Sequence, residues 1–213
     1  MGVSASPAFA FDHLVVAAPA LAAAVAHVEE RLGVPMAGGG AHPGFATHNR
    51  LLGLGDCYAE ALARDPDATP TRPRWFGLDD PAFAAGAATP PALRTFVVRV
   101  SDLDRALSAC PDLGLRAVEA RRGDLRWRIG LRDDGAMPLQ GACPTFIEWP
   151  DGHGPARGLP DCGRRLLSLD VIHPEAARIM RALEGLDDAR IRYETGPFAL
   201  RATIQTPDGK CVV

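Results

Sequence analysis

One order of predicted elements, a strand, a helix and then further strands, occurs twice in this chain and limits the possible folds more than any other feature. In the first copy, the residues AFDHLVVA at 10–17 predict a strand. Apolar residues recur at helical spacing over 20–32 and predict a helix that ends at Gly33. Two copies of this motif occupy residues 10–150.

The first copy continues with a glycine-rich loop, GGGAHPG, and a predicted hairpin, THNRLLGLGDCYAEAL. Gly55 and Asp56 suit a two-residue turn between the strands of this hairpin. With that turn, Leu51 lies opposite Glu60. The same face of the hairpin carries Asn49, Gly53 and Tyr58.

The second copy starts with the strand RTFVVRV and the helix SDLDRALSACPDLG, which begins with a serine or aspartate cap. LRAVEARR, LRWRIGLR and PTFIEWP predict three more strands. Alignment of the two helix starts pairs Leu21 with Leu103. The same alignment pairs His13 with Thr95, and the last strands match as CYAEAL and PTFIEW.

The chain is therefore expected to be divided into a region of paired modules and a C-terminal extension. The βαβββ modules occupy 10–64 and 93–150 within residues 1–155, and the connector 65–92 carries six prolines without a sustained period. Residues 156–213 predict a βαββ extension packed on the same domain. We expect a strand of this extension to continue one of the sheets.

Composition favours a soluble cytoplasmic protein with a small-molecule partner. The formal net charge of -3 and the pI of about 6.1 give no electrostatic basis for binding nucleic acid or an anionic membrane. Five cysteines without a CxxC pair indicate a reducing compartment. No apolar run approaches the roughly 18–20 residues that span a bilayer. The arginine, alanine, glycine and proline bias is typical of a GC-rich bacterial genome.

Three residues are candidates for a metal site. Glu60 and Glu148 lie in the last strands of the two copies, and His13 lies in the first strand of the first copy. One imidazole and two carboxylates suit a divalent manganese, iron, nickel or zinc ion and leave positions for substrate oxygens. The alternative is that each is a structural or solvated strand residue.

Further candidates could contact a substrate. His42 and His48 flank the glycine-rich loop, where they either approach a ligand or cap turns. Asn49 could hold a substrate oxygen or bond the neighbouring strand. Arg126 and Arg128 point the same way on their strand, so Arg128 either clamps a carboxylate or lies on a solvated face.

The segments FDHLVV, GGGAHPGFATHNRLLGLGDCYAEAL and FIEWPDG, in this order of elements, resemble the vicinal oxygen chelate superfamily, and most closely its glyoxalase-like branch. The resemblance covers residues 10 to about 155 and implies an α+β fold in which paired modules form a cup-shaped mixed sheet. It implies metal ligands from the first and last strands of each module, which by position are His13, Glu60 and Glu148. Thr95 stands at the fourth position, where glyoxalase I has another ligand.

Two functions of different classes follow from this resemblance. The first is a metal-dependent lyase, isomerase or dioxygenase acting on a small oxygen-rich metabolite, with Glu60 or Glu148 moving a proton. The second is a metal-free protein that sequesters a small molecule, similar to bleomycin-resistance proteins. A site that has lost its activity and keeps a structural role is the third alternative. A homodimer is compatible with the fold, but two modules in one chain do not require it.

Overall fold

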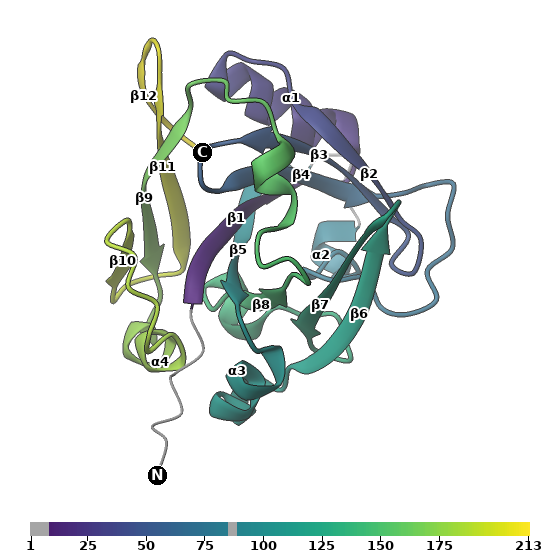
Figure 1. Cartoon of the computed structure of the whole chain (residues 1–213), viewed down its shortest axis with the longest axis vertical. Helices are drawn as coiled ribbons and strands as arrows, with labels where there is room; N and C mark the ends of the chain where they lie inside the picture. The colour runs from purple at the N-terminus through teal and green to yellow at the C-terminus, as the bar shows by residue number, and fades with distance from the viewer. Residues whose placement is uncertain (1–8, 85–88) are drawn as a thin grey trace.

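The computed structural model describes residues 9–84 and 89–213, and its main feature is a curved eight-stranded sheet. The strand order is β2-β3-β4-β1-β5-β8-β7-β6. The first copy of the repeated unit supplies β1 to β4 and the second supplies β5 to β8 (Figure 1). The predicted α+β fold, with paired βαβββ modules in one cup-shaped mixed sheet, is confirmed.

The first module follows the predicted order of elements. Leu51 on β3 pairs with Glu60 on β4, so the predicted register of this hairpin is confirmed. The elements of the module are β1 (Phe9–Ala17), α1 (Leu21–Leu32), β2 (Ala37–His42), β3 (Thr47–Gly53) and β4 (Tyr58–Arg64).

The segment predicted as a glycine-rich loop forms the edge strand β2. Gly38, Gly39 and Gly40 have φ angles of 61°, 98° and 156°, and the β2–β3 register shifts between Ala37 and Gly40. A Cβ atom at Gly39 would lie 2.2 Å from the carbonyl oxygen of Asn49. The strand therefore contains an irregularity that requires glycine, whereas the low strand propensity of glycine favours a loop.

The second module repeats the arrangement. Its helix begins at Asp102, whose side chain accepts a hydrogen bond from the Arg105 N–H, so the aspartate alternative of the predicted cap is confirmed. The elements are β5 (Ala92–Val100), α3 (Leu103–Ala109), β6 (Arg116–Arg122), β7 (Leu125–Leu131) and β8 (Thr145–Glu148).

The two modules join along their first strands. Strands β1 and β5 pair antiparallel at the centre of the sheet, while β1 pairs in parallel with β4 and β5 pairs in parallel with β8. The outermost strands, β2 and β6, contact each other. The sheet is therefore curled into a cup rather than open at both edges.

The two faces of the sheet carry separate apolar clusters. On the convex face, Leu14, Phe96 and Phe146 pack with apolar side chains of α1 and α3. On the concave face, Val15 and Val97 belong to a second cluster with several aromatic rings. Neighbours in sequence such as Leu14 and Val15 belong to different clusters because side chains alternate along a strand.

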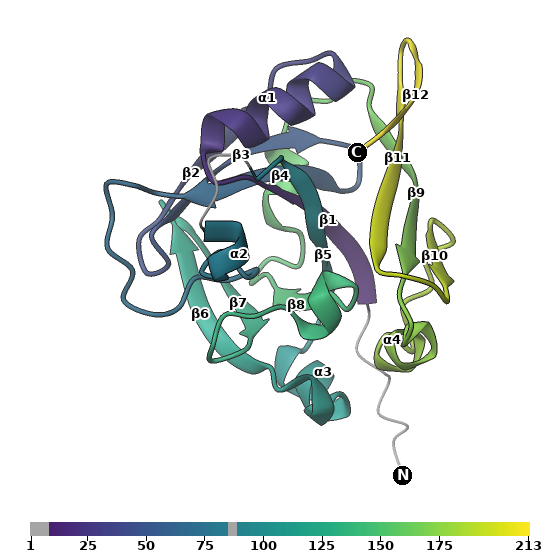
Figure 2. The same cartoon turned by 180° about the vertical axis from the view of Figure 1, so that it is seen from behind.

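The C-terminal unit forms a second sheet of four strands in the order β10-β9-β11-β12. The expectation that a strand of this unit continues one of the module sheets is therefore wrong. The two outer strands of the eight-stranded sheet contact each other. The four-stranded sheet instead packs on the convex side of the first, beside β1 and β5 (Figures 1 and 2). Its elements are β9 (Arg165–Ile172), α4 (Ala176–Ala182), β10 (Ile191–Glu194), β11 (Ala199–Thr206) and β12 (Gly209–Val212).

Apolar and polar contacts join the second sheet to the first. Leu169 and Ile204 are fully buried in the same cluster as Phe11 of β1. The guanidinium of Arg190 lies 2.8 Å from the Asp56 carboxylate at the β3–β4 turn, and its carbon lies 5.7 Å from the Phe11 ring centroid. The two sheets therefore share one apolar core.

The predicted connector contains little regular structure. It includes the short helix α2 (Pro81–Ala84), and residues 85–88 lie outside the described part of the chain. Within residues 9–84 and 89–213, no helix is long and apolar enough to cross a membrane.

The shared core predicts that both sheets unfold together. Replacing Leu169 by Ala removes a fully buried side chain of the second sheet and is expected to lower the free energy of unfolding by about 2–5 kcal/mol. All three tryptophans, Trp75, Trp127 and Trp149, lie in the concave cluster of the first sheet. Urea titrations followed by tryptophan fluorescence should therefore show the lower midpoint.

Leu167→Ala is the matched control, because Leu167 lies on the same strand and is 38% exposed. It is expected to change stability by no more than about 0.5 kcal/mol. A tryptophan transition that is unaffected by Leu169→Ala, while far-UV circular dichroism shows an earlier loss of structure, would mean that the sheets unfold independently.

Candidate functional site

Polar side chains from four neighbouring strands meet on the concave face of the first module. His13 comes from β1, His42 from β2, Asn49 from β3, and Tyr58 and Glu60 from β4, and all five line one cavity. Each is at most 5% exposed. Polar groups at this depth are stable only when they bond to one another, so their partners determine the geometry.

A bulge in β1 brings Asp12 into this group. The β1–β5 register shifts between Phe11 and His13, which leaves Asp12 as the extra residue. Its carboxylate lies 2.7 Å from His13 Nδ1 and accepts a hydrogen bond of 3.1 Å from Trp149 Nε1. In the neutral imidazole, Nδ1 therefore carries the proton, and the lone pair of Nε2 is directed toward Glu60.

Glu60 is held through one of its two oxygens. Its Oε1 accepts a hydrogen bond from Asn49 Nδ2, and its Oε2 lies 3.7 Å from His13 Nε2. The amide oxygen of Asn49 accepts hydrogen bonds of 3.0 Å from Arg122 Nη1 and from the Gly40 N–H. These two donors determine which end of the amide faces Glu60.

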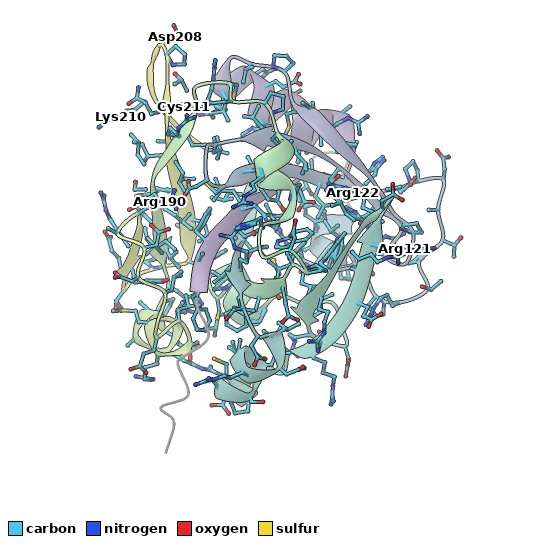
Figure 3. The ribbon with its side chains drawn as sticks, viewed as in Figure 1. Arg121, Arg122, Arg190, Asp208, Lys210 and Cys211 are labelled. Carbon is cyan, nitrogen blue, oxygen red and sulfur yellow. The ribbon has the colours of Figure 1, made fainter. Side chains whose placement is uncertain are left out.

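Arg122 reaches this group from the other module. It lies at the end of β6, beside Arg121 and close to β2 (Figure 3). Its side chain passes over Gly40, where a Cβ atom would lie only 3.2 Å from Arg122 Cγ. The site therefore contains one guanidinium that is present only because β2 and β6 meet.

His42 is a neutral part of the network. Its Nδ1 lies 3.1 Å from Thr47 Oγ1, and its Nε2 lies 3.4 Å from Asn49 Nδ2. Burial, and then the charge of Arg122, lower the pKa of His42 to about 3. At neutral pH the imidazole is uncharged and holds the Asn49 amide from the second side.

Aromatic rings close the cavity. Trp75, Phe76, Trp127 and Trp149 line it together with the polar group, and its volume is about 30 Å³. The ring centroids of Trp127 and Trp149 lie 5.2 Å apart. The buried Nε1 of Trp75 has no acceptor within hydrogen-bonding distance among the described residues. An unsatisfied buried donor costs about 1–3 kcal/mol, so this indole N–H would be stabilised by an oxygen acceptor.

Glu148 does not belong to this cavity. Ile147 and Trp149, its neighbours in sequence, both line the cavity. The carboxylate of Glu148 instead accepts a hydrogen bond of 2.9 Å from Arg128 Nη1, and Arg128 also donates to Asp104 of α3. Glu148 thus lies on the convex side of the sheet.

The second module has threonines at the positions that correspond to His13 and Glu60. Thr95 corresponds to His13. Glu60 pairs with the residue two positions after His13, and Thr145 pairs with the residue two positions after Thr95. Thr145 therefore corresponds to Glu60. Glu148 follows Thr145 by three residues. An odd separation along a strand reverses the face, so the two halves of the cup are chemically unequal.

The predicted three-ligand metal site does not form. His13 Nε2 and Glu60 Oε2 face each other, but Glu148 lies elsewhere, and no group of three or more His, Cys, Asp or Glu side chains in the described residues could hold a metal ion. Asp12 is bonded to His13, and Arg122 already contributes a positive charge. These donors do not fit a resident manganese, iron, nickel or zinc ion.

The other sequence candidates separate in the same way. His42 and Asn49 belong to the buried group, whereas His48 points to the opposite side of β3 from Asn49. Arg128 lies on the convex side with Glu148. The structure therefore brings His13, His42, Asn49 and Glu60 together.

Sequence reasoning missed Asp12 and Arg122. The available signal for Asp12 was an acidic residue directly before a histidine in an otherwise apolar strand, where neither is expected to be buried alone. For Arg122 the sequence offered no signal. Its position follows from the contact between two strands that are far apart in the chain.

Comparison with known proteins identifies related domains. A family model described as glyoxalase-like domain matches residues 11–186, which include both modules and α4. None of the curated proteins matches this sequence.

Several solved structures are similar to this chain. A hypothetical protein from Staphylococcus aureus has a TM-score of 0.60 at 14% identity, over 88% of this chain and 86% of that chain. Methylmalonyl-CoA epimerase from Mycobacterium tuberculosis has a TM-score of 0.44 at 18% identity, over 70% of this chain and 91% of its own. A variant of the Streptomyces coelicolor epimerase, in complex with 2-nitronate-propionyl-CoA, has a TM-score of 0.45 at 17% identity, over 66% and 96%.

The buried neutral His42 predicts a loss of stability in acid. Below the ordinary histidine pKa of about 6.5 the unfolded chain binds a proton that folded His42 does not bind until about pH 3. Stability from this group is therefore complete above pH 6.5 and falls toward pH 3, by up to about 1.4 kcal/mol per pH unit. Urea unfolding of His42→Gln between pH 7 and pH 4 should show a shallower dependence than the unsubstituted protein.

His48→Gln is the control, because His48 lies on the opposite side of the same strand. It should keep the pH dependence of the unsubstituted protein. Equal slopes for His42→Gln and the unsubstituted protein would show that folding does not lower the pKa of His42.

Proposed function

Because this chain belongs to the glyoxalase-like domain family of the vicinal oxygen chelate superfamily, we propose that it is an enzyme that transfers protons on a small oxygen-rich metabolite. One observation carries the proposal: His13 Nε2 and Glu60 Oε2 face each other at 3.7 Å in a buried cavity. The partners of each group hold it in place. The class of reaction is an isomerisation or a lyase-type elimination beside a carbonyl group.

Glu60 is the proposed base. Asn49 occupies its Oε1, which leaves Oε2 to accept a proton from a carbon atom next to the substrate carbonyl. The protonated form of His13, oriented by Asp12, donates a proton from Nε2 to the carbonyl oxygen. Glu60 then returns its proton to the former carbonyl carbon, while the original hydroxyl group of the substrate gives its proton to His13 Nε2 and becomes the new carbonyl. The isomerisation is then complete with no net change in the protein.

Arg122 supports this chemistry electrostatically. Negative charge develops on the substrate oxygen as the carbon loses its proton, and a nearby guanidinium in a poorly solvated cavity stabilises such charge. Arg122 reaches the cavity without a carboxylate partner among the described residues, since its bond goes to the neutral Asn49 amide. Trp75, whose Nε1–H has no acceptor among the described residues, lines the same cavity.

A metal-free binding protein is the second candidate. The aromatic lining of the cavity by Trp75, Trp127 and Trp149 favours this reading. The second module also has threonines in place of His13 and Glu60. Such a protein would bind a ligand in the cup without exchanging its protons. The two candidates therefore differ in a measurable outcome.

Proton transfer is tested by incubating the protein in D2O with a panel of α-hydroxycarbonyl compounds and 2-hydroxy acids, including dihydroxyacetone, lactaldehyde and lactate. Proton NMR should show loss of the α-proton signal of at least one compound. Glu60→Gln should reduce the exchange rate by about 100-fold or more, because the base is removed while the hydrogen bonds of the amide remain feasible. Exchange is expected to persist after EDTA treatment.

Glu148→Gln distinguishes this site from the three-ligand set, since its carboxylate bonds Arg128 on the convex side; this variant should keep the exchange. Exchange that EDTA abolishes and a divalent metal restores would support the metal-dependent mechanism instead. Ligand-induced changes of tryptophan fluorescence without exchange would support the binding protein. No exchange above the buffer rate with any compound contradicts the proton-transfer function.

A further inference from the structure

A pocket of about 620 Å³ lies between the connector, the β7–β8 connection and the C-terminal unit. Arg74, Gly77 and Asp80 line it from the connector, and Phe198 lines it from the segment before β11. Among the described residues, none lines both this pocket and the cavity at Glu60. The proton-transfer chemistry proposed above therefore makes no use of it. Junctions between units of a chain are common places for small ligands.

Arg94 enters this pocket from a bulge in β5. The β1–β5 ladder shifts register twice, and the shifts leave Asp12 of β1 and Arg94 of β5 as extra residues. Asp12 directly precedes His13, and Arg94 directly precedes Thr95, the equivalent residue of the second module. The second module therefore repeats the bulge of the first, but it presents a positive charge where the first presents a carboxylate.

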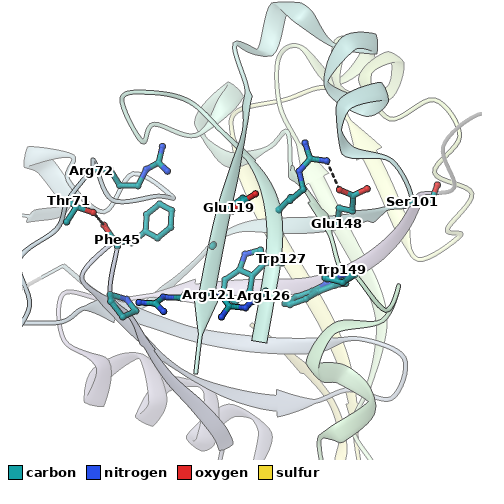
Figure 4. Close-up of a pocket in the computed structure, with 15 residues that line it drawn as sticks. Phe45, Thr71, Arg72, Ser101, Glu119, Arg121, Arg126, Trp127, Glu148 and Trp149 are labelled. Atoms are coloured by element: carbon teal, nitrogen blue, oxygen red, sulfur yellow. Dashed lines mark hydrogen bonds and ion pairs between the residues drawn. The ribbon is translucent and has the colours of Figure 1, made fainter. Parts of the chain in front are cut away.

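Arg94 lacks the partners that a partly buried arginine normally has. Arg128, for comparison, donates a hydrogen bond of 2.9 Å to Glu148 in another pocket (Figure 4). The Nε–H of Arg94 is buried without an acceptor among the described residues, and its guanidinium carbon lies 4.8 Å from the centroid of the Phe83 ring. Burial lowers the pKa of Arg94, and the charge of Asp80 offsets this only in part. The positive charge of Arg94 is therefore incompletely compensated.

The aspartates that line the pocket differ in their pairing. Asp79 accepts hydrogen bonds from the backbone N–H and the guanidinium of Arg74, and Asp134 accepts two from Arg132. Asp80 forms no ion pair among the described residues and accepts a hydrogen bond from the backbone N–H of the second residue of α2. An occupant beside Arg94 therefore meets one uncompensated positive charge, while Asp80 opposes a second negative charge on the same molecule.

Backbone contacts fix the walls of the pocket. The Gly77 N–H donates a hydrogen bond of 3.0 Å to the Gly135 carbonyl, which joins the connector to the β7–β8 connection. A Cβ atom at Gly141 would lie 2.1 Å from the Arg94 carbonyl oxygen, so this connection also lies directly against β5. Met137 and Phe198 give the pocket an apolar part next to its charged part.

We propose that this pocket binds a small monocarboxylate whose carboxylate group accepts hydrogen bonds from Arg94. The planar guanidinium offers the forked donors that match a carboxylate. A single negative charge suits the site because Asp80 repels a second one, and the apolar part of the molecule packs on Met137 and Phe198. The site is additional to the cavity at Glu60 and does not depend on the function proposed for that cavity.

The experiment titrates the protein, labelled with 15N-arginine, with benzoate and follows the Nε–Hε resonance of Arg94 by NMR. The variant Arg94→Lys removes this resonance and so assigns it. Benzoate should shift it saturably, whereas benzamide, which has the same shape without the charge, and sodium chloride at equal ionic strength should not. Inorganic phosphate should bind at least about tenfold more weakly than benzoate, because it carries close to two negative charges near neutral pH.

Three variants make the result specific, with benzoate affinity measured from the NMR signals of the ligand. Arg94→Met should bind benzoate at least about tenfold more weakly. Asp80→Asn keeps an oxygen for the N–H at the start of α2 and should bind at least about twofold more tightly, because the repulsion is removed. Arg192→Gln changes an arginine that pairs with Asp170 outside the pocket and should leave the affinity unchanged.

Equal binding of benzoate and benzamide, undiminished affinity in Arg94→Met, or saturable binding of phosphate alone would overturn the proposal. If Arg94→Met does not fold, the titration of the unsubstituted protein still decides, since an Arg94 resonance that benzoate does not shift contradicts the site. Glu60→Gln should bind benzoate normally, because Glu60 does not line this pocket. The result is thus independent of whether the cavity at Glu60 exchanges substrate protons.

Discussion

The antiparallel pairing of β1 with β5 is the constraint on which the rest of the structure depends. It joins the two modules along their first strands, and each module then adds its last strand on the outer side. All eight strands therefore enter one sheet, whose curvature brings β2 and β6 together. The concave face encloses the polar group, while the convex face offers the apolar surface that α1, α3 and the second sheet cover.

The site depends on two short hydrogen-bonded chains that end opposite each other. In one chain Asp12 orients His13, and in the other Arg122 and His42 fix the Asn49 amide that holds Glu60. Each chain satisfies groups that would otherwise be costly to bury. The first module supplies His13 and Glu60, the two side chains proposed to react, and the second supplies the guanidinium and much of the aromatic wall. The modules are therefore alike in fold and different in chemistry.

Much of the fold could be predicted because strand and helix periods are local properties of the sequence. The Leu51–Glu60 register followed from a two-residue turn, and it correctly placed Asn49 and Glu60 on one face. The same reasoning could not place Glu148, because no short hairpin connects β8 to the strand beside it. The position equivalent to Glu60 is Thr145, three residues before Glu148. With a period of two, that difference is enough to put the side chain on the opposite face.

By itself, the sequence determined the repeated module, the family and the half of the site that lies within β1, β3 and β4, because these depend on local alternation and on one tight turn. Tertiary structure alone decided the bulge that presents Asp12, the entry of Arg122 and the separate C-terminal sheet. The physical reason is that a bulge, the closure of a sheet and the packing of one sheet on another arise from contacts between distant segments, which the local pattern of apolar and polar residues does not encode.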